Sequence, residues 1–368
     1  MAPASRPSSS SPTTTTPIKS SPVIAEQAKT ITVFQRTPNF SIPAHNHPLD
    51  QEQLDKNKEA FQQLRREAEN FVPARSGGET QIPKAFDLND EELQQRYEQH
   101  WEMGGVAFMT SYADLLVNRE ANDTAADFVR TKIHEIVADP TAADLLSPAN
   151  HPLGTKRICV DTSYYDTFNR DNATLVDVSN APIEEITPAG IRTADAEYEF
   201  DTLVFATGFD AMTGALLAVD IRGRNDLSLR DVWLDGPRTY LGLQVVDFPN
   251  LFTITGPGSP SVLSNMLISI EQHVDWISDC MEYMRERDFT TIEATTESQD
   301  AWVEHVRELG EKTLYPLANS WYIGANIPGK PRVFTPYVAG VGPYRKRCDE
   351  IAANGYEGFA LTAETVTA

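Results

Sequence analysis

The stretch F-D-T-L-V-F-A-T-G-F-D-A, residues 200–211, decides how the rest of the chain is interpreted. Its apolar run, residues 203–205, is typical of a strand that is buried on both faces of a parallel sheet. The small residues Ala206, Thr207 and Gly208 end the run, and a glycine there lets the backbone turn sharply or approach a ligand closely. Ligands of open α/β sheets bind beyond the carboxyl ends of strands. The stretch therefore predicts a ligand-side strand end, although an ordinary strand-to-loop turn has the same pattern.

The composition is that of a globular chain with a strong negative charge. Its 368 residues are 40% hydrophobic and 23% charged, and the formal net charge is -22. Nucleic-acid surfaces need clustered Lys and Arg, so we expect no nucleic-acid partner. No apolar run approaches the length that crosses a bilayer, so we also expect no membrane span.

The three cysteines, Cys159, Cys280 and Cys348, are odd in number and widely spaced. This pattern argues against a disulfide framework and for a reducing compartment, and we therefore expect a cytoplasmic protein.

The nearest approach to a metal-ligand motif is His45 and His47 in a proline-flanked loop. We interpret both histidines as surface residues and predict no metal site.

The amino-terminal residues 1–19 are almost all Ser, Thr, Pro and Ala. Such a segment cannot bury enough apolar surface to fold, so we expect it to be disordered. Order is predicted to begin with a short helix in which Ser21 is the N-cap and Pro22 is the first helical residue.

A β-rich strand, residues 30–35, follows this helix and ends at Arg36 and Thr37. A helix, a buried strand and then an arginine form the second half of a mononucleotide-binding βαβ unit, in which the arginine can hold the 2'-phosphate of NADP. The Ser/Thr/Pro tract stands where such a unit has its glycine-rich loop. Arg36 is therefore either a phosphate ligand or a solvated charge at a strand end.

The chain from Asp50 to about Ser147 has the pattern of several helices. Asp50 and Gln53 resemble a capping box, and Thr124 is the expected cap of a later helix. Apolar side chains recur at helical spacing, which predicts packing and gives the block no chemistry. They are Leu54, Phe61, Leu64, Ala68 and Phe71, then Leu93, Tyr97 and Trp101, then Phe128, Ile133, Ile136 and Val137. We interpret the block as an insertion between two parts of an α/β domain.

An adjacent pair of cations, Lys156 and Arg157, stands out in this acidic chain. On a loop such a pair can straddle a polyanion, and a guanidinium offers a planar fork of donors that suits an oxyanion. A surface Lys-Arg dipeptide is the alternative interpretation. A strand over residues 174–178 and a hairpin turning at residues 188–190 then lead to the opening stretch.

Glycines also follow a second apolar run, residues 250–255, which predicts another buried strand. Ser259 and Pro260 are expected to cap and begin a long helix, whose amino terminus would point free N–H groups beyond the strand. Gly256 and Gly258 would allow a ligand to come close. The helix is predicted to bury one apolar stripe, formed by Leu263, Met266, Leu267, Ile270, Val274, Ile277, Met281 and Met284.

A helix over about residues 298–313 precedes a loop rich in Gly, Asn and Pro, residues 318–331. The loop contains Trp321 and Tyr322. These rings either stack on a flat ligand or form a core beneath the loop.

Five motifs, taken in order, resemble those of one enzyme family. They are F-Q-R-T-P-N (34–39), G-T-K-R with the downstream Y-Y and F-N-R-D-N (154–172), A-T-G-F-D-A with the downstream T-G-A (206–215), G-P-G-S-P-S-V-L-S-N-M (256–266) and W-Y-I-G-A-N-I-P-G-K (321–330). Together they resemble the Baeyer–Villiger monooxygenases, close to the bacterial phenylacetone and cyclohexanone enzymes. The likeness runs from about Ser20 to the carboxyl terminus.

The resemblance implies a reaction and a fold. The family uses FAD, NADPH and O2 to insert one oxygen atom beside a ketone carbonyl, which gives an ester or a lactone, and a role in secondary metabolism is a further expectation. The implied fold is α/β: an incomplete flavoprotein with two Rossmann-like dinucleotide-binding domains and a helical insertion. The expected divisions are a disordered tract (1–19), two parts of the NADP domain (20–42 and 153–205), the helical insertion (43–152) and the carboxyl-terminal part of the FAD domain (206–368).

Roles for single residues are likewise implied by the matching motifs. Arg157 matches the active-site arginine of the family, which stabilises negative charge beside the flavin. Arg36 and Thr37, with Lys156 beside them, would recognise the 2'-phosphate of NADP. The other implied site residues are Gly208 on the flavin side, Trp321 at the nicotinamide cofactor, Met266 at the flavin, and Ser261, Val262 and Leu263 lining the flavin and substrate pocket.

The chain also departs from the family pattern. The family carries two G-x-G-x-x-G fingerprints and an F-x-G-x-x-x-H-x-x-x-W signature, and this sequence contains none of them. The resemblance therefore implies an amino-terminally truncated relative that lacks both pyrophosphate-binding loops. The alternatives to an independent oxidase are an inactive remnant, a binding protein, or one half of a split enzyme that a separate chain completes.

Overall fold

The computed structural model describes residues 8–12, 15–48, 50–71 and 82–363. The chain divides into two compact units. The first comprises residues 1–48 and 82–209, and the second comprises residues 49–81 and 210–368. Among the described residues, no helix combines the length and the apolar character that crossing a bilayer requires.

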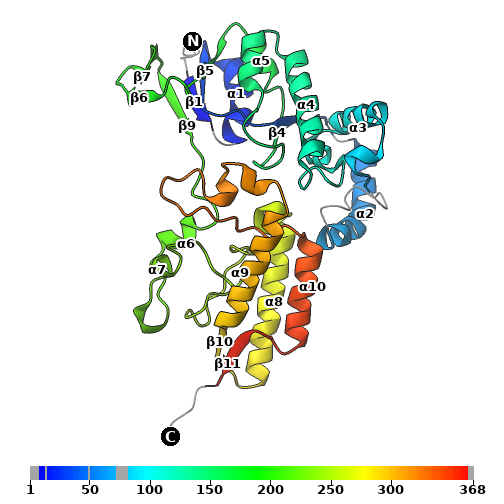
Figure 1. Ribbon diagram of the computed structural model, residues 1–368, viewed down its shortest axis with the longest axis vertical. Helices are drawn as coiled ribbons and strands as arrows, with labels where there is room; N and C mark the ends of the chain where they lie inside the picture. The colour runs from blue at the N-terminus through cyan, green and yellow to red at the C-terminus, as the bar shows by residue number, and fades with distance from the viewer. Residues whose placement is uncertain (1–7, 13–14, 49, 72–81, 364–368) are drawn as a thin grey trace. The chain divides into compact units, whose positions relative to one another are not determined.

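A four-stranded parallel sheet forms the centre of the first unit (Figure 1). Its strand order is β5 (Ala173–Asp177), β2 (Ile31–Gln35), β1 (Ser8–Pro12) and β9 (Thr202–Ala206). Helix α1 (Thr15–Gln27) connects β1 to β2, because parallel neighbours need a crossover connection. The predicted α/β fold is confirmed, and β2 and β5 lie where the sequence predicts strands.

The Ser/Thr/Pro tract does not behave as its composition predicts. Residues 8–12 form β1 and α1 begins at Thr15, so the expectation of disorder over residues 1–19 is wrong for these residues. The rest of the tract before Thr15 lies outside the described residues. The composition argument counts only side-chain burial, whereas a central parallel strand is held by backbone hydrogen bonds on both of its edges. Strand β1 has such partners, since it pairs with β2 on one side and with β9 on the other.

Helix α1 begins earlier than predicted. Pro22 lies inside the helix, and Ser21 is a buried helical residue instead of an N-cap. A proline inside a helix removes a backbone donor, which destabilises the helix. The core of the unit offsets this loss by burying Ile18 and Ala25, which are 4% and 1% exposed.

Strand β9 contains the apolar run with which the sequence analysis began, and it lies at an edge of the sheet. Only Ala206 in this strand is buried, and Phe205 is 65% exposed. The prediction of a strand is confirmed, but the prediction that both faces are buried is wrong. An apolar run indicates that a segment can be buried, and it does not indicate which faces the neighbouring elements cover.

Two small sheets complete the strands of the first unit. The predicted hairpin is confirmed: β6 (Ile183–Ile186) and β7 (Gly190–Thr193) are antiparallel, and β8 (Glu197–Glu199) pairs with β7. The second sheet joins β3 (Ser41–Pro43) to β4 (Cys159–Asp161) in parallel. This pairing brings together segments that are far apart in the sequence.

Helices α3 (Asp90–Met103), α4 (Arg119–Ile136) and α5 (Pro140–Leu146) belong to the same unit. They bury an aromatic core made of Tyr97, Trp101, Phe108, Tyr112 and Phe128. Helix α3 ends at Gly104, whose φ of 71° suits glycine. Helix α4 begins after Asn118, not after the expected Thr124, because the Asn118 side chain accepts the first free N–H groups.

The second unit is mostly helical (Figure 1). It contains α2 (Gln51–Glu69), α6 (Gly214–Ala218), α7 (Leu229–Val232), α8 (Met266–Glu286), α9 (Thr296–Glu311), α10 (Val341–Ala353) and a two-stranded sheet of β10 (Thr291–Ala294) and β11 (Phe359–Thr362). The expected N-cap of α2 is confirmed, because Asp50 accepts the Gln53 N–H at 2.7 Å. Helix α2 buries no side chain, so the expected packing of Phe61 and Leu64 does not occur. The block 43–152 is therefore divided between the two units.

Helix α8 buries a face that only partly overlaps the predicted one, since Met284 is buried and Ile277 packs against the core. Leu267, Val274 and Met281 of the predicted stripe are 70%, 42% and 61% exposed. The buried face consists of Ile268, Ser269, Gln272, His273, Trp276, Cys280 and Met284. Apolar content alone misplaced part of the buried face, because three of the buried side chains are polar.

The predicted strand over residues 250–255 is also absent from the described structure. The segment makes single hydrogen bonds, from Asn250 N to Ile292 O at 2.9 Å and from Thr253 N to Leu243 O at 2.8 Å. Single bonds to different segments do not make a ladder, so the apolar run does not join a sheet within the described residues.

His273 is the polar centre of the buried face of α8 and has no exposed surface. Its Nδ1 accepts the Thr255 N–H at 2.9 Å, and its Nε2 lies 2.8 Å from Tyr344 Oη. The Tyr344 hydroxyl donates to Leu241 O at 2.6 Å, so the proton between the two side chains must be on Nε2. Both ring nitrogens are thus satisfied in the neutral form, and burial lowers the pKa of His273 to about 4.

Acid should destabilise the chain through His273. The unfolded chain gains a proton near the ordinary histidine pKa of about 6.5, whereas the folded chain does so only near a pKa of about 4. This contribution to the unfolding free energy is complete above about pH 6.5, and about 3 kcal/mol of it is lost as the pH falls to about 4. Urea unfolding at several pH values checks this.

The comparison variant is His273→Gln, which should lack this component of the pH dependence. His305→Gln, at an exposed position of α9, is the matched control and should keep it. The same pH dependence in His273→Gln and in the unchanged chain would contradict the assignment.

Candidate cofactor-binding site

The motifs F-Q-R-T-P-N and G-T-K-R meet in the first unit. Residues 36–39 lead from β2 into β3, and residues 154–157 lead into β4. The pairing of β3 with β4 and a hydrogen bond from Cys159 N to Phe40 O at 3.1 Å hold the two segments together. The structure therefore brings together four of the predicted site residues, Arg36, Thr37, Lys156 and Arg157.

Asn39 locks these two segments to each other. Its Nδ2 donates to Arg157 O at 2.9 Å and lies 3.3 Å from Cys159 Sγ. The backbone of Arg157 is thereby fixed while its side chain stays exposed. A guanidinium on a fixed backbone at the surface of its unit can reach a ligand at a small cost in backbone entropy.

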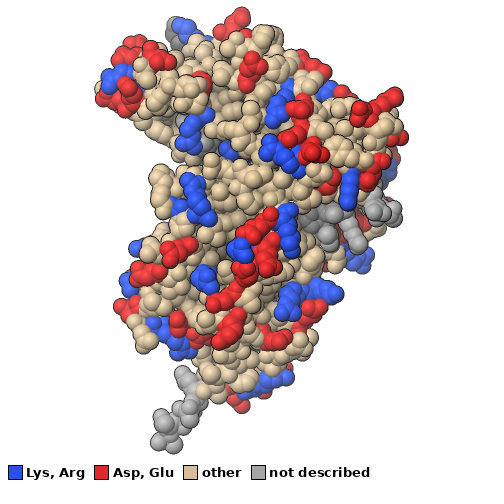
Figure 2. Space-filling view, viewed as in Figure 1, with Lys and Arg blue, Asp and Glu red and all other residues tan. Residues whose placement is uncertain are grey.

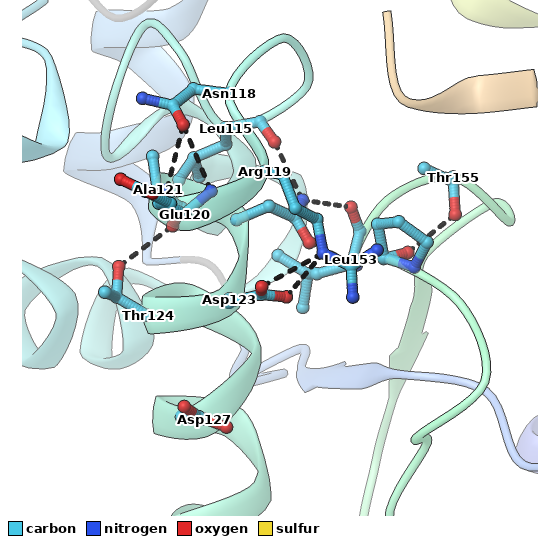
Figure 3. Close-up of polar contacts among 12 residues, drawn as sticks. Leu115, Asn118, Arg119, Glu120, Ala121, Asp123, Thr124, Asp127, Leu153 and Thr155 are labelled. Atoms are coloured by element: carbon cyan, nitrogen blue, oxygen red, sulfur yellow. Dashed lines mark hydrogen bonds and ion pairs between the residues drawn. The ribbon is translucent and has the colours of Figure 1, made fainter. Parts of the chain in front are cut away.

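A clamp from α4 holds the loop that leads into β4 (Figure 3). Asn122 is fully buried and donates through Nδ2 to Leu115 O at 2.7 Å and to Leu153 O at 2.9 Å. Its Oδ1 accepts the Leu153 N–H at 2.8 Å. The Thr155 hydroxyl then donates to Pro152 O at 2.6 Å. One side chain thus satisfies both backbone groups of Leu153, and a tight turn follows it.

Positive charge gathers where the two motifs meet. Burial and the charge of Arg36 lower the pKa of Lys156, so these two cations lie close to each other. Within the described part of the chain, no carboxylate forms an ion pair with either of them. Figure 2 shows acidic and basic side chains interspersed over one face, as expected where charges of opposite sign are paired. An uncompensated pair of cations in a chain of net charge -22 indicates a site for an anion.

His151 adds an open acceptor to this cluster. Burial, and then the charges of Lys156 and Arg130, lower its pKa to about 3, so the ring is neutral. Nδ1 lies 2.7 Å from Asn150 Oδ1, which can only accept, so Nδ1 carries the proton. The Nε2 lone pair is buried and has no partner among the described residues. A hydroxyl or N–H of a bound ligand would satisfy it.

Gly208 turns the chain sharply at the end of β9. Its φ of 85° lies in the left-handed region, which favours glycine. The expected tight turn after the apolar run is therefore confirmed.

In the second unit, Lys330 forms an ion pair with Asp210 and donates to Ala211 O at 2.7 Å. The motif W-Y-I-G-A-N-I-P-G-K is thus anchored to the residues that follow the turn.

The segment before α8 is a short 3-10 turn, Ser261–Leu263, and not the first turn of the long helix. Helix α8 begins at Met266, where the Asn265 side chain accepts the Leu267 N–H at 3.1 Å. The expected cap at Ser259 is therefore wrong. The Ser259 hydroxyl instead donates to Gly256 O at 2.7 Å, inside the loop.

The glycines of G-P-G serve internal packing. A Cβ on Gly256 would lie 2.5 Å from Gly242 O, and one on Gly258 would lie 2.9 Å from Thr239 Oγ1. Neither position could carry a side chain without a shift of its neighbours. These contacts account for glycine at both positions, and the close approach of a ligand stays a prediction.

The two aromatic residues of the loop at residues 318–331 have different environments. Tyr322 is 3% exposed and belongs to the core beneath the loop. Trp321 is half-buried, and the centroid of its ring lies 4.2 Å from that of Tyr322. Only Trp321 therefore retains surface with which a flat ligand could stack.

Several known monooxygenases are similar to this chain over nearly its whole length. A Baeyer–Villiger monooxygenase from Pseudooceanicola batsensis is 40% identical over 344 residues, which is 92% of this chain and 62% of that protein. Cyclohexanone 1,2-monooxygenase from Acinetobacter is 39% identical over 341 residues. The crystal structure of cyclohexanone monooxygenase from Rhodococcus bound to NADP+ superimposes with a TM-score of 0.94 at 35% identity, over 98% of this chain and 68% of that one.

The chain belongs to the Baeyer–Villiger monooxygenase family. A second solved structure, an oxidized steroid monooxygenase bound to NADP, is 43% identical with a TM-score of 0.90 over 98% of this chain and 67% of that one. No protein-family model matches the chain. The chain spans about 63% of the length of a further curated relative, 2-oxo-Delta(3)-4,5,5-trimethylcyclopentenylacetyl-CoA monooxygenase of Pseudomonas putida, to which it is 39% identical.

The predicted site residues of this family member fall into two groups. The first unit holds Arg36, Thr37, Lys156, Arg157 and Gly208, and the second unit holds Ser261, Val262, Leu263, Met266 and Trp321. Their assignment to particular ligands stays a prediction.

Sequence reasoning missed three residues that build the first group: Asn39, Asn122 and His151. A signal for Asn122 was present, because it shares a helical face with the small apolar residues Ala125 and Ala126. A lone amide among alanines on a buried face indicates a hydrogen bond to another segment. No comparable pattern marks Asn39 or His151.

The Asn122 clamp should be measurable by replacement with leucine. Asn122→Leu keeps the volume but leaves the Leu153 N–H and two buried carbonyl groups without their partner. We expect the unfolding free energy to fall by about 3 kcal/mol. Hydrogen exchange of the Leu153 amide should also become faster than in the unchanged chain.

The matched control is Asp123→Asn, one residue along α4, where an exposed ion pair with Arg119 is lost. That change should lower the unfolding free energy by less than about 1 kcal/mol. Unchanged exchange at Leu153 in Asn122→Leu would show that the loop is held by other contacts.

Proposed function

We propose that this chain is an FAD- and NADPH-dependent Baeyer–Villiger monooxygenase, which inserts one oxygen atom of O2 beside a ketone carbonyl to give an ester or a lactone. The observation that carries the proposal is the uncompensated pair of cations, Arg36 and Lys156, next to Arg157 in a member of this family. The names of three relatives support a ketone substrate: cyclohexanone 1,2-monooxygenase, cyclopentanone 1,2-monooxygenase and acetone monooxygenase (methyl acetate-forming). A secondary-metabolite ketone is the proposed physiological substrate.

The cation pair fits the 2'-phosphate of NADPH. Arg36 is exposed and can offer a fork of donors, and the half-buried Lys156 adds a second positive charge. Thr37 follows Arg36 directly in the chain, and its hydroxyl can donate to a phosphate oxygen. The open Nε2 of His151 could accept from a hydroxyl of the ligand. NADH lacks the 2'-phosphate, so these residues would favour NADPH.

FAD, when bound, would supply the activation of O2, and this part of the proposal rests on family membership. The side chain of Arg157 is proposed to lie by the flavin and stabilise negative charge that develops during the reaction. The hydrogen bond from Asn39 to Arg157 O fixes the backbone from which the guanidinium extends. Gly208, Met266 and Trp321 are proposed cofactor contacts, and Ser261, Val262 and Leu263 are proposed to line the substrate pocket.

A second candidate function, a non-catalytic binding protein or one half of a split enzyme, is favoured by a different observation. Helix α8 exposes an apolar face on which Leu267 and Met281 are 70% and 61% exposed. Such a face is normally covered by other protein. Flavin binding separates the two candidates: an absorbance spectrum without flavin, after incubation with FAD, would reject catalysis by this chain alone.

The 2'-phosphate assignment can be tested by binding alone. Arg36→Gln and Lys156→Gln each remove one charge from the phosphate contact, and each should weaken NADPH binding about tenfold or more. Binding of NADH should change little, because it has no 2'-phosphate. Arg119→Gln, at an exposed residue of α4, is the matched control. Equal weakening of NADPH and NADH binding would contradict the assignment.

The role of Arg157 can be tested in the flavin-loaded chain with cyclohexanone as the probe. Arg157→Gln should reduce ester formation by about 100-fold or more, because a donor aimed at developing charge is lost. The flavin spectrum should be unchanged, since the side chain is exposed. Retained ester formation would refute the role, whereas loss of flavin would show that Arg157 binds the cofactor.

A further inference from the structure

The second unit contains a pocket that is distinct from every residue proposed above for cofactor or substrate. It has a volume of about 490 Å³, which is within the range of small-molecule sites, roughly 300–1,000 Å³. Helices α9 and α10 contribute most of its lining. We call it the α9–α10 pocket, and its principal lining residues are Tyr240, Trp302, Tyr337, Lys346, Arg347 and Glu350.

The aromatic wall of the α9–α10 pocket is rigid. Trp302 and Tyr337 are stacked, with ring centroids 5.5 Å apart and an angle of 6° between the planes. The Trp302 indole donates to Gly258 O at 3.0 Å, and Tyr337 N donates to Ser259 O at 2.9 Å. The wall is therefore formed before any ligand arrives, which lowers the entropic cost of binding.

The Tyr337 side chain places an unused polar group in this wall. Tyr337 is only 5% exposed, yet its hydroxyl makes no hydrogen bond with any described residue. Its neighbours differ in this respect: the Tyr240 hydroxyl donates to Glu357 O at 3.0 Å, and the Tyr344 hydroxyl donates to Leu241 O. The hydroxyl oxygen keeps some contact with solvent, so a ligand atom that accepts from Tyr337 would take the place of water there.

The charges beside the pocket are only weakly compensated. Lys346 and Arg347 share Glu350, at distances of 4.0 Å and 3.7 Å, both beyond hydrogen-bond range. Other arginines of the unit have close partners, such as Arg238 with Asp300 at 2.5 Å. The two cations and one carboxylate leave a positive charge next to the Tyr337 phenol, where an anionic group of a ligand would be attracted.

We propose that the α9–α10 pocket binds a small aromatic carboxylate, with its ring against the wall of Trp302 and Tyr337 and its carboxylate between the Arg347 guanidinium and the Tyr337 hydroxyl. The wall supplies apolar contact, the guanidinium supplies charge, and the phenol supplies a directional donor. This site is additional to the proposed oxidation and does not depend on it.

The test uses salicylate as the probe and salicylamide as its neutral counterpart, with the full chain and no added cofactor. Isothermal titration calorimetry should show saturable binding of salicylate, at least about tenfold tighter than that of salicylamide. Equal affinity for the two compounds, or no saturable binding of salicylate up to about 10 mM, would overturn the proposal.

Two variants locate the binding to this pocket. Arg347→Gln and Tyr337→Phe should each weaken salicylate binding, the first about tenfold or more and the second about fivefold or more. Arg347 is exposed and Tyr337→Phe keeps the stacked ring, so at least one variant should fold. Arg285→Gln, at an exposed arginine of α8 that does not line the pocket, should leave binding unchanged. Unchanged affinity in both pocket variants would place salicylate elsewhere and overturn the proposal.

Discussion

The first unit depends on the backbone pairing of β1 with two neighbours at once. In the order β5-β2-β1-β9, this strand alone connects the β5–β2 pair to β9. Backbone N–H and C=O groups pair regardless of the side chain they carry, so a serine-rich segment can occupy the centre of a parallel sheet. The carboxyl ends of β2 and β9, from which Arg36 and Gly208 follow, are thereby held at one edge of the same sheet.

Hydrogen bonds from amide side chains hold the segments of the candidate site together, and cationic side chains give the site its positive charge. Asn39 and Asn122 each connect segments far apart in sequence through backbone groups, and neither contributes charge. They place Lys156 close to Arg36 in spite of electrostatic repulsion between the two cations. Folding thus holds two positive charges close together. An anion bound beside them would reduce their mutual repulsion, which favours binding of an anionic ligand.

Local patterns predicted many elements well, and they failed where burial involves polar groups. The buried apolar residues of α3, the strands β2 and β5 and the hairpin of β6 and β7 all follow from periodicity and turn residues. The buried face of α8 does not, because Ser269, Gln272 and His273 lie on it. His273 can be buried only because Thr255 and Tyr344 supply its hydrogen bonds, and no pattern within the helix reveals such partners.

The sequence by itself determined the family, the α/β class and the presence of two cationic motifs, since these depend on residue types and on spacing along the chain. Only the tertiary structure decided that Arg36 and Lys156 are neighbours, that protein atoms occupy the positions where Cβ atoms on Gly256 and Gly258 would lie, and that a serine-rich tract becomes a central strand. The physical reason is the same in each case. Hydrogen-bond partners, nearby charges and excluded volume come from segments distant in the sequence, and folding alone brings them within contact distance.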